Sequence, residues 1–241
     1  PIIDRLGRII AVLAGTPTTG RYADDLMAAY GEMNREAKAA GLGEYDKEAH
    51  KRGKFHAYNC GTTLGMGTPY PVLLKPGDMA PVLARILGHQ GFKRMARFQD
   101  RSLNIWAPRL YNEYDDVRTT VQSKLNLPWN FQGSVFAAAA FNFGGKVSTF
   151  LHRDFLNWAF GWCAITALGR FNPRRNARLI LWEVKPVIDF PPVSTILLPS
   201  TVITHSNTTI AEGDSQYTAG PIFRWVQNGC RTEKQFEKED P

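Results

Sequence analysis

The chain has 241 residues, 44% of them hydrophobic and 21% charged, so it is long enough to enclose a core and is too apolar for a disordered chain. Its formal net charge of +7 favours polyanionic partners such as nucleic acid or a membrane surface, without establishing either. No apolar run approaches the roughly 18 residues of a membrane span. The three widely spaced cysteines give neither a disulfide framework nor a zinc knuckle.

The first third of the chain has mainly helical patterns. Between Tyr22 and Ala40, apolar residues recur near helical spacing and two glycines follow, which predicts an amphipathic helix with a defined end. A second pattern of this kind covers Asp78–Gly91. The Gly- and Thr-rich stretch between them, residues 60–71, predicts a loop or an irregular strand.

After about residue 130, short apolar or alternating runs recur between Gly, Pro and Asn, and these predict strands. Helices followed by strands indicate an α+β fold, with N-terminal helices bracing one sheet of a double-stranded β-helix (jelly-roll or cupin-like) core. We expect a helical or mixed extension at 1–129 packed on the core, a catalytic core at 130–229 and a charged tail at 230–241. The predicted strands are Ser134–Phe143, Gly161–Leu168, Leu179–Val184, Val187–Phe190, Thr195–Leu198, Val202–Ser206 and Gln216–Trp225.

Two histidines and an aspartate in the strand-rich part are candidate metal ligands. His152 and Asp154 follow the first long strand, and residues two apart in an extended segment point to the same side. His205 lies on a later predicted strand. Two His and one carboxylate form the facial triad of non-heme Fe(II) oxygenases, which leaves positions open for a chelating cosubstrate and O2. The pattern therefore predicts an Fe(II) site at His152, Asp154 and His205.

A 2-oxoglutarate cosubstrate also needs a cation for its far carboxylate. Arg224 lies on the predicted strand that follows His205, and a guanidinium can pair with a carboxylate as a bidentate fork. Asn142, at the end of the first strand, can donate to the same cosubstrate. Each feature alone has an ordinary alternative: a chance HxD pair, a structural histidine or a surface arginine. Their order on successive strands favours an Fe(II)/2-oxoglutarate-dependent dioxygenase.

Several short sequence segments in this strand-rich part are similar to segments of a known protein family. Residues 152–157 (HRDFLN) match an H-x-D-x-x-N signature, and further matches lie in 160–169, 191–200, 205–207 and 216–225, of which the long ones are the more specific. The chain thereby resembles the TET/JBP-type dioxygenases, in particular the group expanded in basidiomycete fungi. The similarity covers most of residues 130–229 and extends more loosely toward the N-terminus.

This resemblance implies Fe(II) on the triad, 2-oxoglutarate on Arg224, and O2 as the second cosubstrate. It implies a base in DNA, with duplex DNA as the expected partner, and oxidation of 5-methylcytosine to 5-hydroxymethylcytosine and further. Asn157 would hydrogen-bond the Watson–Crick edge of the target base, although from the residues alone a turn or cap residue is the better interpretation. We expect a nuclear monomer that does not enter a membrane.

A base in a duplex must be flipped out of the stack to reach the iron, and this requires phosphate contacts. Arg170, Arg174 and Arg175 lie between two predicted strands, where a loop can grip a nucleic-acid backbone. Further basic residues gather at 51–54 and 93–94, for which a solvated surface is the ordinary interpretation. Phe155 and Trp158 are candidate walls of a base pocket, with core packing as the alternative.

Two loops depart from the family pattern, because residues 211–215 are shorter than expected and residues 174–178 replace a Gly-rich turn. Alternative functions are an N6-methyladenine demethylase, a thymine oxidase, a hydroxylase of a protein or small molecule, and an inactive nucleic-acid-binding module. The intact triad and Arg224 argue against the last, and the positive charge and Asn157 favour DNA.

Overall fold

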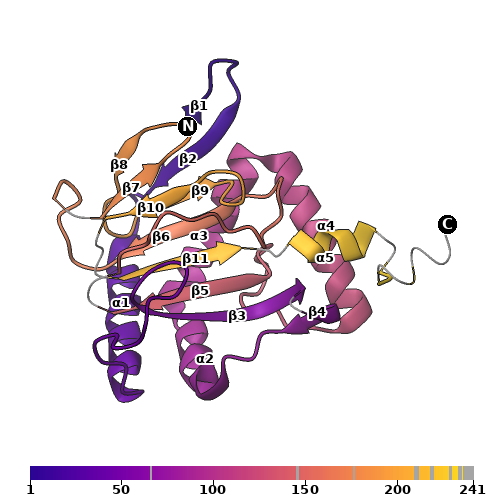
Figure 1. Ribbon diagram of the computed structural model, residues 1–241, viewed down its shortest axis with the longest axis horizontal. Helices are drawn as coiled ribbons and strands as arrows, with labels where there is room; N and C mark the ends of the chain where they lie inside the picture. Colours follow the sequence, from indigo (N-terminus) through magenta and orange to yellow (C-terminus); the bar gives the residue numbers. More distant parts are fainter. Residues whose placement is uncertain are drawn as a thin grey trace.

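The computed structural model describes residues 1–65, 67–144, 147–175, 177–208, 212–217, 220–227, 230–232 and 235. The helices are α1 (Tyr22–Ala39), the short 3-10 helix η1 (Gly77–Met79), α2 (Ala80–Gly88), α3 (Gln90–Trp106), α4 (Pro108–Leu125) and α5 (Gly220–Gln227). The strands are β1 (Ile2–Ile3), β2 (Ile9–Gly15), β3 (His56–Gly65), β4 (Thr68–Leu73), β5 (Ala138–Phe143), β6 (Cys163–Leu168), β7 (Arg178–Leu181), β8 (Val187–Asp189), β9 (Thr195–Leu198), β10 (His205–Asn207) and β11 (Glu212–Tyr217). The predicted combination of helices and antiparallel sheets is confirmed (Figure 1).

The strands form two antiparallel sheets. The larger has the order β1-β2-β9-β6-β11-β5-β3-β4, and the smaller has the order β10-β7-β8. Along the chain, β5 and β6 lie in the larger sheet, β7 and β8 in the smaller, β9 in the larger, β10 in the smaller and β11 in the larger again. Apolar side chains from both sheets fill the space between them, including Leu181 and Ile196, which are fully buried. This alternation places segments distant in sequence beside each other.

Helices α1 and α3 cover the outer face of the larger sheet (Figure 1). Strand β5 shows how its sequence produces this arrangement, because its side chains alternate between the two faces. Phe141 and Phe143 pack in the cluster with the helices, whereas Asn142 faces the interior beside the smaller sheet. Phe141 meets Phe92 of α3 edge to face, with ring centroids 5.5 Å apart. The helix predicted from Tyr22 is confirmed by α1.

The N-terminal part contains more strand than the sequence pattern predicts. Strands β3 and β4 cover most of the stretch expected to be a loop or irregular strand. The first six residues of β3, 56–61, pair with all of β5. Gly61 permits this close approach, since a Cβ there would lie 2.3 Å from the Ala137 carbonyl oxygen. The helix expected over Asp78–Gly91 is divided at His89, whose backbone is extended and whose Nδ1 accepts a hydrogen bond from the Gly91 N–H.

The last predicted strand, Gln216–Trp225, is wrong in its second half. Strand β11 ends at Tyr217, and residues 220–227 form α5. Ile222, Phe223 and Trp225 are buried from this helix, so their apolar character comes from packing on one helical face rather than from strand alternation. The predicted boundaries at residues 129 and 229 stay a prediction.

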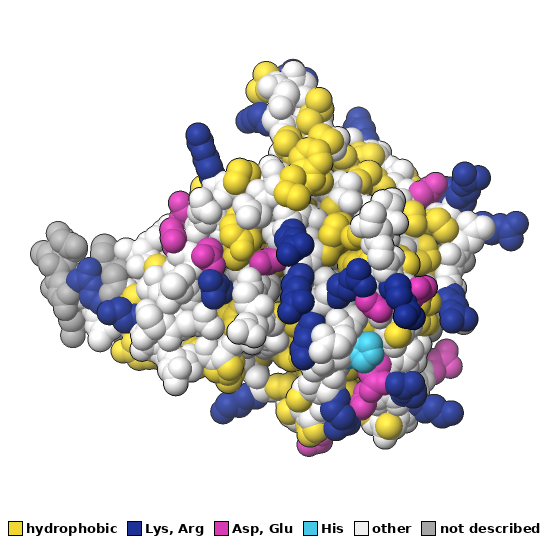
Figure 2. All heavy atoms as spheres, turned by 180° about the vertical axis from the view of Figure 1, so that it is seen from behind, with side chains coloured by type: hydrophobic (Ala, Val, Ile, Leu, Met, Phe, Trp, Pro, Cys, Tyr) yellow, Lys and Arg dark blue, Asp and Glu magenta, His cyan; other side chains and the backbone are white. Residues whose placement is uncertain are grey.

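The outer surface of the helices is highly charged. Lys and Arg side chains are spread over this face among Asp and Glu, as Figure 2 shows from behind. The β1–β2 hairpin, at the top of both views, instead exposes apolar side chains, namely Ile3, Leu6, Ile9 and Leu13. Among the described residues, no helix has the length and apolar composition needed to cross a bilayer.

Asp100 joins α3 to the segment that precedes β5. Its Oδ1 accepts hydrogen bonds from the Val135 N–H at 2.9 Å and from the Ser134 Oγ at 3.2 Å. Burial raises the pKa of Asp100 to about 6 in spite of these bonds. The folded protein therefore keeps a proton on this carboxyl at pH values where the unfolded chain, with a pKa near 3.8, has released it.

We predict that the contribution of Asp100 to the free energy of unfolding falls as pH rises from about 4 to about 6 and is constant above that range. Asp100→Asn keeps a hydrogen-bond acceptor without the charge, so it should remove this dependence and stabilise the fold at pH 7 by on the order of 1–3 kcal/mol. Urea denaturation at several pH values measures both effects. Asp115→Asn, which alters an ion pair on α4, should keep the wild-type profile. An unchanged profile in Asp100→Asn would contradict the prediction.

Candidate metal centre

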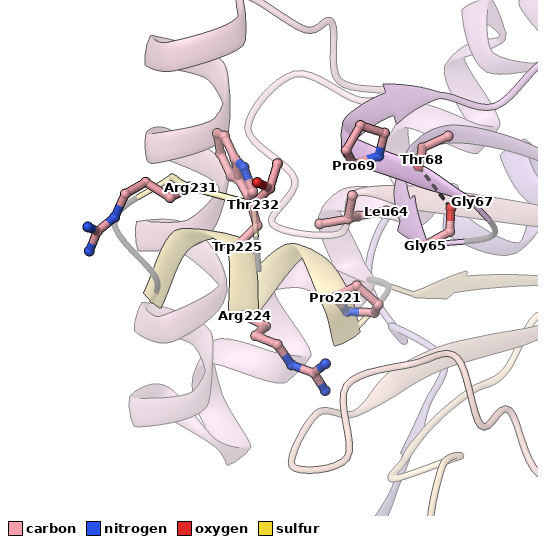
Figure 3. Close-up of a pocket in the computed structure, with 10 residues that line it drawn as sticks. All are labelled: Leu64, Gly65, Gly67, Thr68, Pro69, Pro221, Arg224, Trp225, Arg231 and Thr232. Carbon is pink, nitrogen blue, oxygen red and sulfur yellow. Dashed lines mark hydrogen bonds between the residues drawn. The ribbon is translucent and has the colours of Figure 1, made fainter. Parts of the chain in front are cut away.

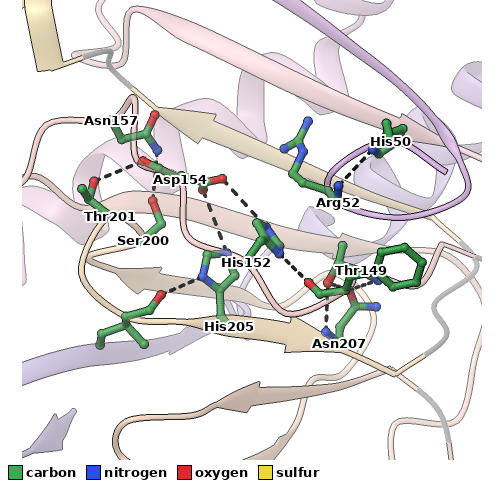
Figure 4. A network of polar contacts seen from close by, with 12 residues as sticks. His50, Arg52, Thr149, His152, Asp154, Asn157, Ser200, Thr201, His205 and Asn207 are labelled. Carbon is green, nitrogen blue, oxygen red and sulfur yellow. Dashed lines mark hydrogen bonds and ion pairs between the residues drawn. The ribbon is translucent and has the colours of Figure 1, made fainter.

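His152, Asp154 and His205 meet where the segment after β5 runs beside β10 (Figure 4). The backbones of His152 and His205 exchange two hydrogen bonds, with N–O distances of 3.1 and 3.0 Å. The two rings lie with centroids 4.4 Å apart. Asp154 reaches both, because its Oδ1 is 3.8 Å from His152 Nε2 and its Oδ2 is 4.0 Å from His205 Nε2. The three ligand atoms lie within 4.8 Å of one another, close enough for a single metal ion.

Both imidazoles are held in the same tautomer. His152 Nδ1 lies 2.7 Å from the Phe150 carbonyl oxygen, and His205 Nδ1 lies 2.9 Å from that of Ile203. Since a carbonyl only accepts, each Nδ1 carries the hydrogen, and each Nε2 presents its lone pair on the side of Asp154. Burial and the neighbouring His205 lower the pKa of His152, which keeps this imidazole neutral and able to bind a metal ion.

Glu183, which follows β7, connects the two segments that carry the ligands. Its Oε2 accepts from the Thr204 N–H at 2.7 Å, and its Oε1 accepts from Arg153 Nη2 at 2.5 Å and from the Thr204 hydroxyl. Arg153 Nε also donates to Thr204 Oγ1 at 2.8 Å. Burial opposes the charge on Glu183, but the hydrogen bonds from Thr204 and Arg153 outweigh it and lower its pKa to about 2. Arg153 lies between His152 and Asp154, and Thr204 directly precedes His205.

Two pockets meet at the triad and share Arg52, His152 and Asp154. The inner pocket, about 70 Å³, extends between the two sheets and is further lined by Asn142, Val147, Thr149, Ile165, Thr166, Ala167, Leu179, Phe190, His205 and Asn207. The outer pocket, about 420 Å³, lies toward the surface and is further lined by Lys51, Asn59, Thr63, Leu64, Leu74, Arg153, Phe155, Leu156, Asn157 and Cys163. An ion held by the triad would thus face a small interior pocket and a larger one that reaches the surface.

Two of the predicted ligand-binding residues lie at these pockets. Asn142 lines the inner pocket, where its Oδ1 is buried and has no hydrogen-bond partner among the described residues. Asn157 lines the outer pocket, and its Nδ2 donates to Ser200 Oγ at 3.0 Å. The Asn157 N–H also donates to the Asp154 carbonyl at 2.9 Å, so the residue belongs to a turn as well. Their roles toward ligands stay predictions.

Arg224 does not lie with the triad. Its predicted role depended on a strand at residues 222–225, and this segment is helical. From α5 it lines a third pocket, about 560 Å³, which contains none of the triad residues (Figure 3). The other lining residues of this third pocket are Leu64, Gly65, Gly67, Thr68, Pro69, Pro221, Trp225, Arg231 and Thr232.

The remaining candidates divide between surface and core. Arg170, Arg174 and Arg175 are exposed between β6 and β7 and line neither the inner nor the outer pocket. Trp158 stacks on Phe223 with ring centroids 3.9 Å apart, which makes core packing the correct interpretation for it. Phe155 is 65% exposed at the outer pocket.

Sequence reasoning missed the position of Arg52. The basic run at 51–54 was interpreted as a solvated surface, yet Arg52 lines both pockets beside His152 and Asp154 (Figure 4). The only signal in the sequence is Gly53, which follows it and allows a close backbone contact. Glu183 was also missed, since an acidic residue after a strand has no distinguishing pattern.

No family model matches the sequence, and no curated protein matches it. A solved structure of NgTET1 in complex with 5mC DNA aligns over 90% of this chain and 74% of that one, with 13% identity and a TM-score of 0.62. The chain has the fold of NgTET1. A prolyl-4-hydroxylase from Pseudomonas putida (14% identity, 86% and 90% of the two chains) and a 2OG-Fe(II) oxygenase from Burkholderia pseudomallei (15%, 83% and 89%) have TM-scores of 0.40 and 0.38. TM-scores this low do not support any conclusion about the fold, so the fold assignment depends on NgTET1 alone.

We predict that Asp154→Ala weakens binding of Fe(II), or of Co(II) as a spectroscopic substitute, at least 100-fold, because it removes the carboxylate that lies beside both imidazoles. Calorimetry and metal-dependent thermal stabilisation measure this loss. Asp189→Ala, which removes an exposed carboxylate paired with Arg178, is the matched control. Wild-type metal affinity in Asp154→Ala would exclude this site.

Glu183→Ala should lower the free energy of unfolding by about 1 kcal/mol and weaken metal binding roughly three- to tenfold, because it releases both ligand segments. The lowered pKa means that the stabilisation by Glu183 is present above its ordinary value near 4.5 and is lost as pH falls toward about 2. Asp189→Ala again serves as control, and an equal effect of both variants on metal affinity would contradict a specific role of Glu183.

Proposed function

We propose that the protein is an Fe(II)- and 2-oxoglutarate-dependent dioxygenase that oxidises the methyl group of a flipped DNA base. The first candidate is 5-methylcytosine, oxidised to 5-hydroxymethylcytosine and further. The observation that carries the proposal is a pair of imidazoles whose Nε2 atoms flank one carboxylate at the junction of two pockets. The NgTET1 fold supports it, and the alternation of strands between the sheets supports a double-stranded β-helix core.

The donor set fits the metal that this function requires. Two neutral imidazoles and one carboxylate are the ligands of a facial Fe(II) site, and His152, Asp154 and His205 would hold the ion. When bound, Fe(II) and 2-oxoglutarate supply the O2-dependent oxidation of a C–H bond. The backbone carbonyls of Phe150 and Ile203 fix the imidazoles, so little reorientation is needed on metal binding.

The outer pocket suits a flipped base. Phe155 and Leu156 are 65% and 45% exposed there and offer an apolar surface against which a base can pack. Because Asn157 uses Nδ2 toward Ser200, its Oδ1 is left to accept a hydrogen bond. If this acceptor faces the exocyclic group of the base, cytosine and adenine offer an amino group there, whereas thymine offers a carbonyl. This contact favours 5-methylcytosine and N6-methyladenine over thymine.

Contacts to the DNA backbone would come from exposed cations. Arg170, Arg174 and Arg175 lie together on the segment between β6 and β7 and are our candidates for phosphate binding. The formal charge of +7 would steer the protein toward duplex DNA. Action as a monomer in the nucleus is part of the same proposal.

The test is incubation with Fe(II), 2-oxoglutarate and duplex oligonucleotides that carry 5-methylcytosine, N6-methyladenine or no modification. Mass spectrometry should detect oxidised 5-methylcytosine, and succinate should form in the same reaction. Succinate formed with a peptide or metabolite, without any oxidised base, would assign the protein to the alternative class of 2-oxoglutarate hydroxylases.

Asn157→Ala should lower kcat/KM for 5-methylcytosine roughly 10- to 100-fold, because a hydrogen-bond acceptor for the base is lost. Asn104→Ala, an exposed asparagine on α3, should have wild-type activity. Metal affinity should be unchanged in both variants. If turnover of methylated DNA is unaffected by Asn157→Ala, Asn157 is a turn residue only.

A further inference from the structure

Residues 50–55 form a loop that is attached to the segment carrying His152. The Phe150 N–H donates to the Arg52 carbonyl at 2.7 Å, and Gly53 pairs with Thr149 in an isolated antiparallel bridge. Gly53 has a φ of +152°, and a Cβ at this position would lie 2.3 Å from the Ser148 carbonyl oxygen. Only glycine therefore permits this contact without displacing the backbone.

The loop is also closed by its own histidine. His50 Nδ1 accepts from the Arg52 N–H at 3.2 Å (Figure 4). Its Nε2 donates to the Phe55 carbonyl at 2.9 Å. The rings of His50 and Phe55 meet edge to face, with centroids 4.6 Å apart. Burial lowers the pKa of His50, which preserves the neutral form that this pair of bonds requires. The backbone of Arg52 is thus held on both sides without any contribution from its side chain.

The Arg52 side chain is a cation without a protein partner. It is half-buried, and among the described residues its guanidinium makes no hydrogen bond or ion pair. It lies beside His152 and Asp154 at the wall that both pockets share (Figure 4). The neighbouring Lys51 differs, because its Nζ lies over the Phe155 ring, 5.6 Å from the centroid, and it lines only the outer pocket.

We propose that Arg52 binds the far carboxylate of 2-oxoglutarate. The inference rests on the proposed dioxygenase function and replaces Arg224, which lines a different pocket. Among the described residues that line the inner pocket, Arg52 is the only Lys or Arg. A guanidinium can hold a carboxylate through two parallel hydrogen bonds, and the buried amide of Asn142 adds a polar group in the same pocket.

Charge balance supports a dicarboxylate in particular. With neutral histidines, a divalent ion, Asp154 and Arg52 leave two net positive charges in a small pocket lined by both sheets. A ligand with two carboxylates neutralises both, whereas a monocarboxylate would leave one charge poorly solvated. The discrimination between 2-oxoglutarate and a 2-oxo acid without the second carboxylate should therefore reside in Arg52.

The experiment compares Arg52→Met, Arg52→Lys and the control Lys51→Met as proteins loaded with Mn(II), which binds without turnover. Calorimetry measures the affinity of each for 2-oxoglutarate and for 2-oxopentanoate, which lacks the far carboxylate. Arg52→Met should weaken 2-oxoglutarate roughly 10- to 100-fold and leave 2-oxopentanoate within about twofold. Arg52→Lys should be intermediate, and Lys51→Met should match the wild type.

Several results would overturn the inference. An unchanged preference for 2-oxoglutarate in Arg52→Met would do so, and so would an equal loss for both acids, which would place Arg52 at the metal end. A loss of affinity for methylated duplex DNA alone would make Arg52 a phosphate contact. Wild-type protein that binds neither Mn(II) nor 2-oxoglutarate would defeat the dioxygenase proposal itself. Unchanged Mn(II) affinity and thermal unfolding show that a variant is folded, and Arg52→Lys keeps the test valid if Arg52→Met is unstable.

Discussion

Two backbone hydrogen bonds between His152 and His205 set the register on which the rest of the site depends. A shift of one residue would turn either imidazole to the opposite face of its strand and separate it from Asp154. Both additional supports act on the same register. Glu183 binds Thr204 and Arg153, next to the ligands, and the loop at residues 50–55 pairs with Thr149 and Phe150 just before them. Two separate parts of the chain thereby hold this pair of segments.

The His152 and Asp154 part of the triad was predictable because its geometry is local, whereas His205 comes from a later strand. The HxD spacing places His152 and Asp154 on one side of any extended segment, and the helix from Tyr22 followed from helical periodicity. Arg224 was misplaced because a short apolar run such as Ile222–Trp225 has no clear period, so helix and strand are hard to distinguish there. The position of Arg52 beside the triad could not be predicted from the sequence, for a different reason. Its position depends on a contact between residues about a hundred positions apart, which leaves only a glycine as a trace in the sequence.

The division into two pockets separates the demands that the proposed reaction places on the protein. The inner pocket is small and is lined by both sheets, with Arg52 and amide and hydroxyl groups in its wall, which suits a cosubstrate that is the same in every turnover. The outer pocket is larger and has apolar side chains at an exposed edge, which suits the part of the site that selects a substrate. Arg52 belongs to both, so the filling of one pocket changes the electrostatic environment of the other.

The pairing of β3 along β5 has a practical consequence for anyone who wishes to shorten the protein. A fragment that starts near residue 130 would retain every metal ligand, yet it would leave β5 as an apolar strand with a free row of N–H and C=O groups. Such an edge recruits strands from other molecules, so the fragment would tend to self-associate and precipitate. It would also lack Arg52. Residues 56–61 therefore protect the core against aggregation as well as extending its sheet.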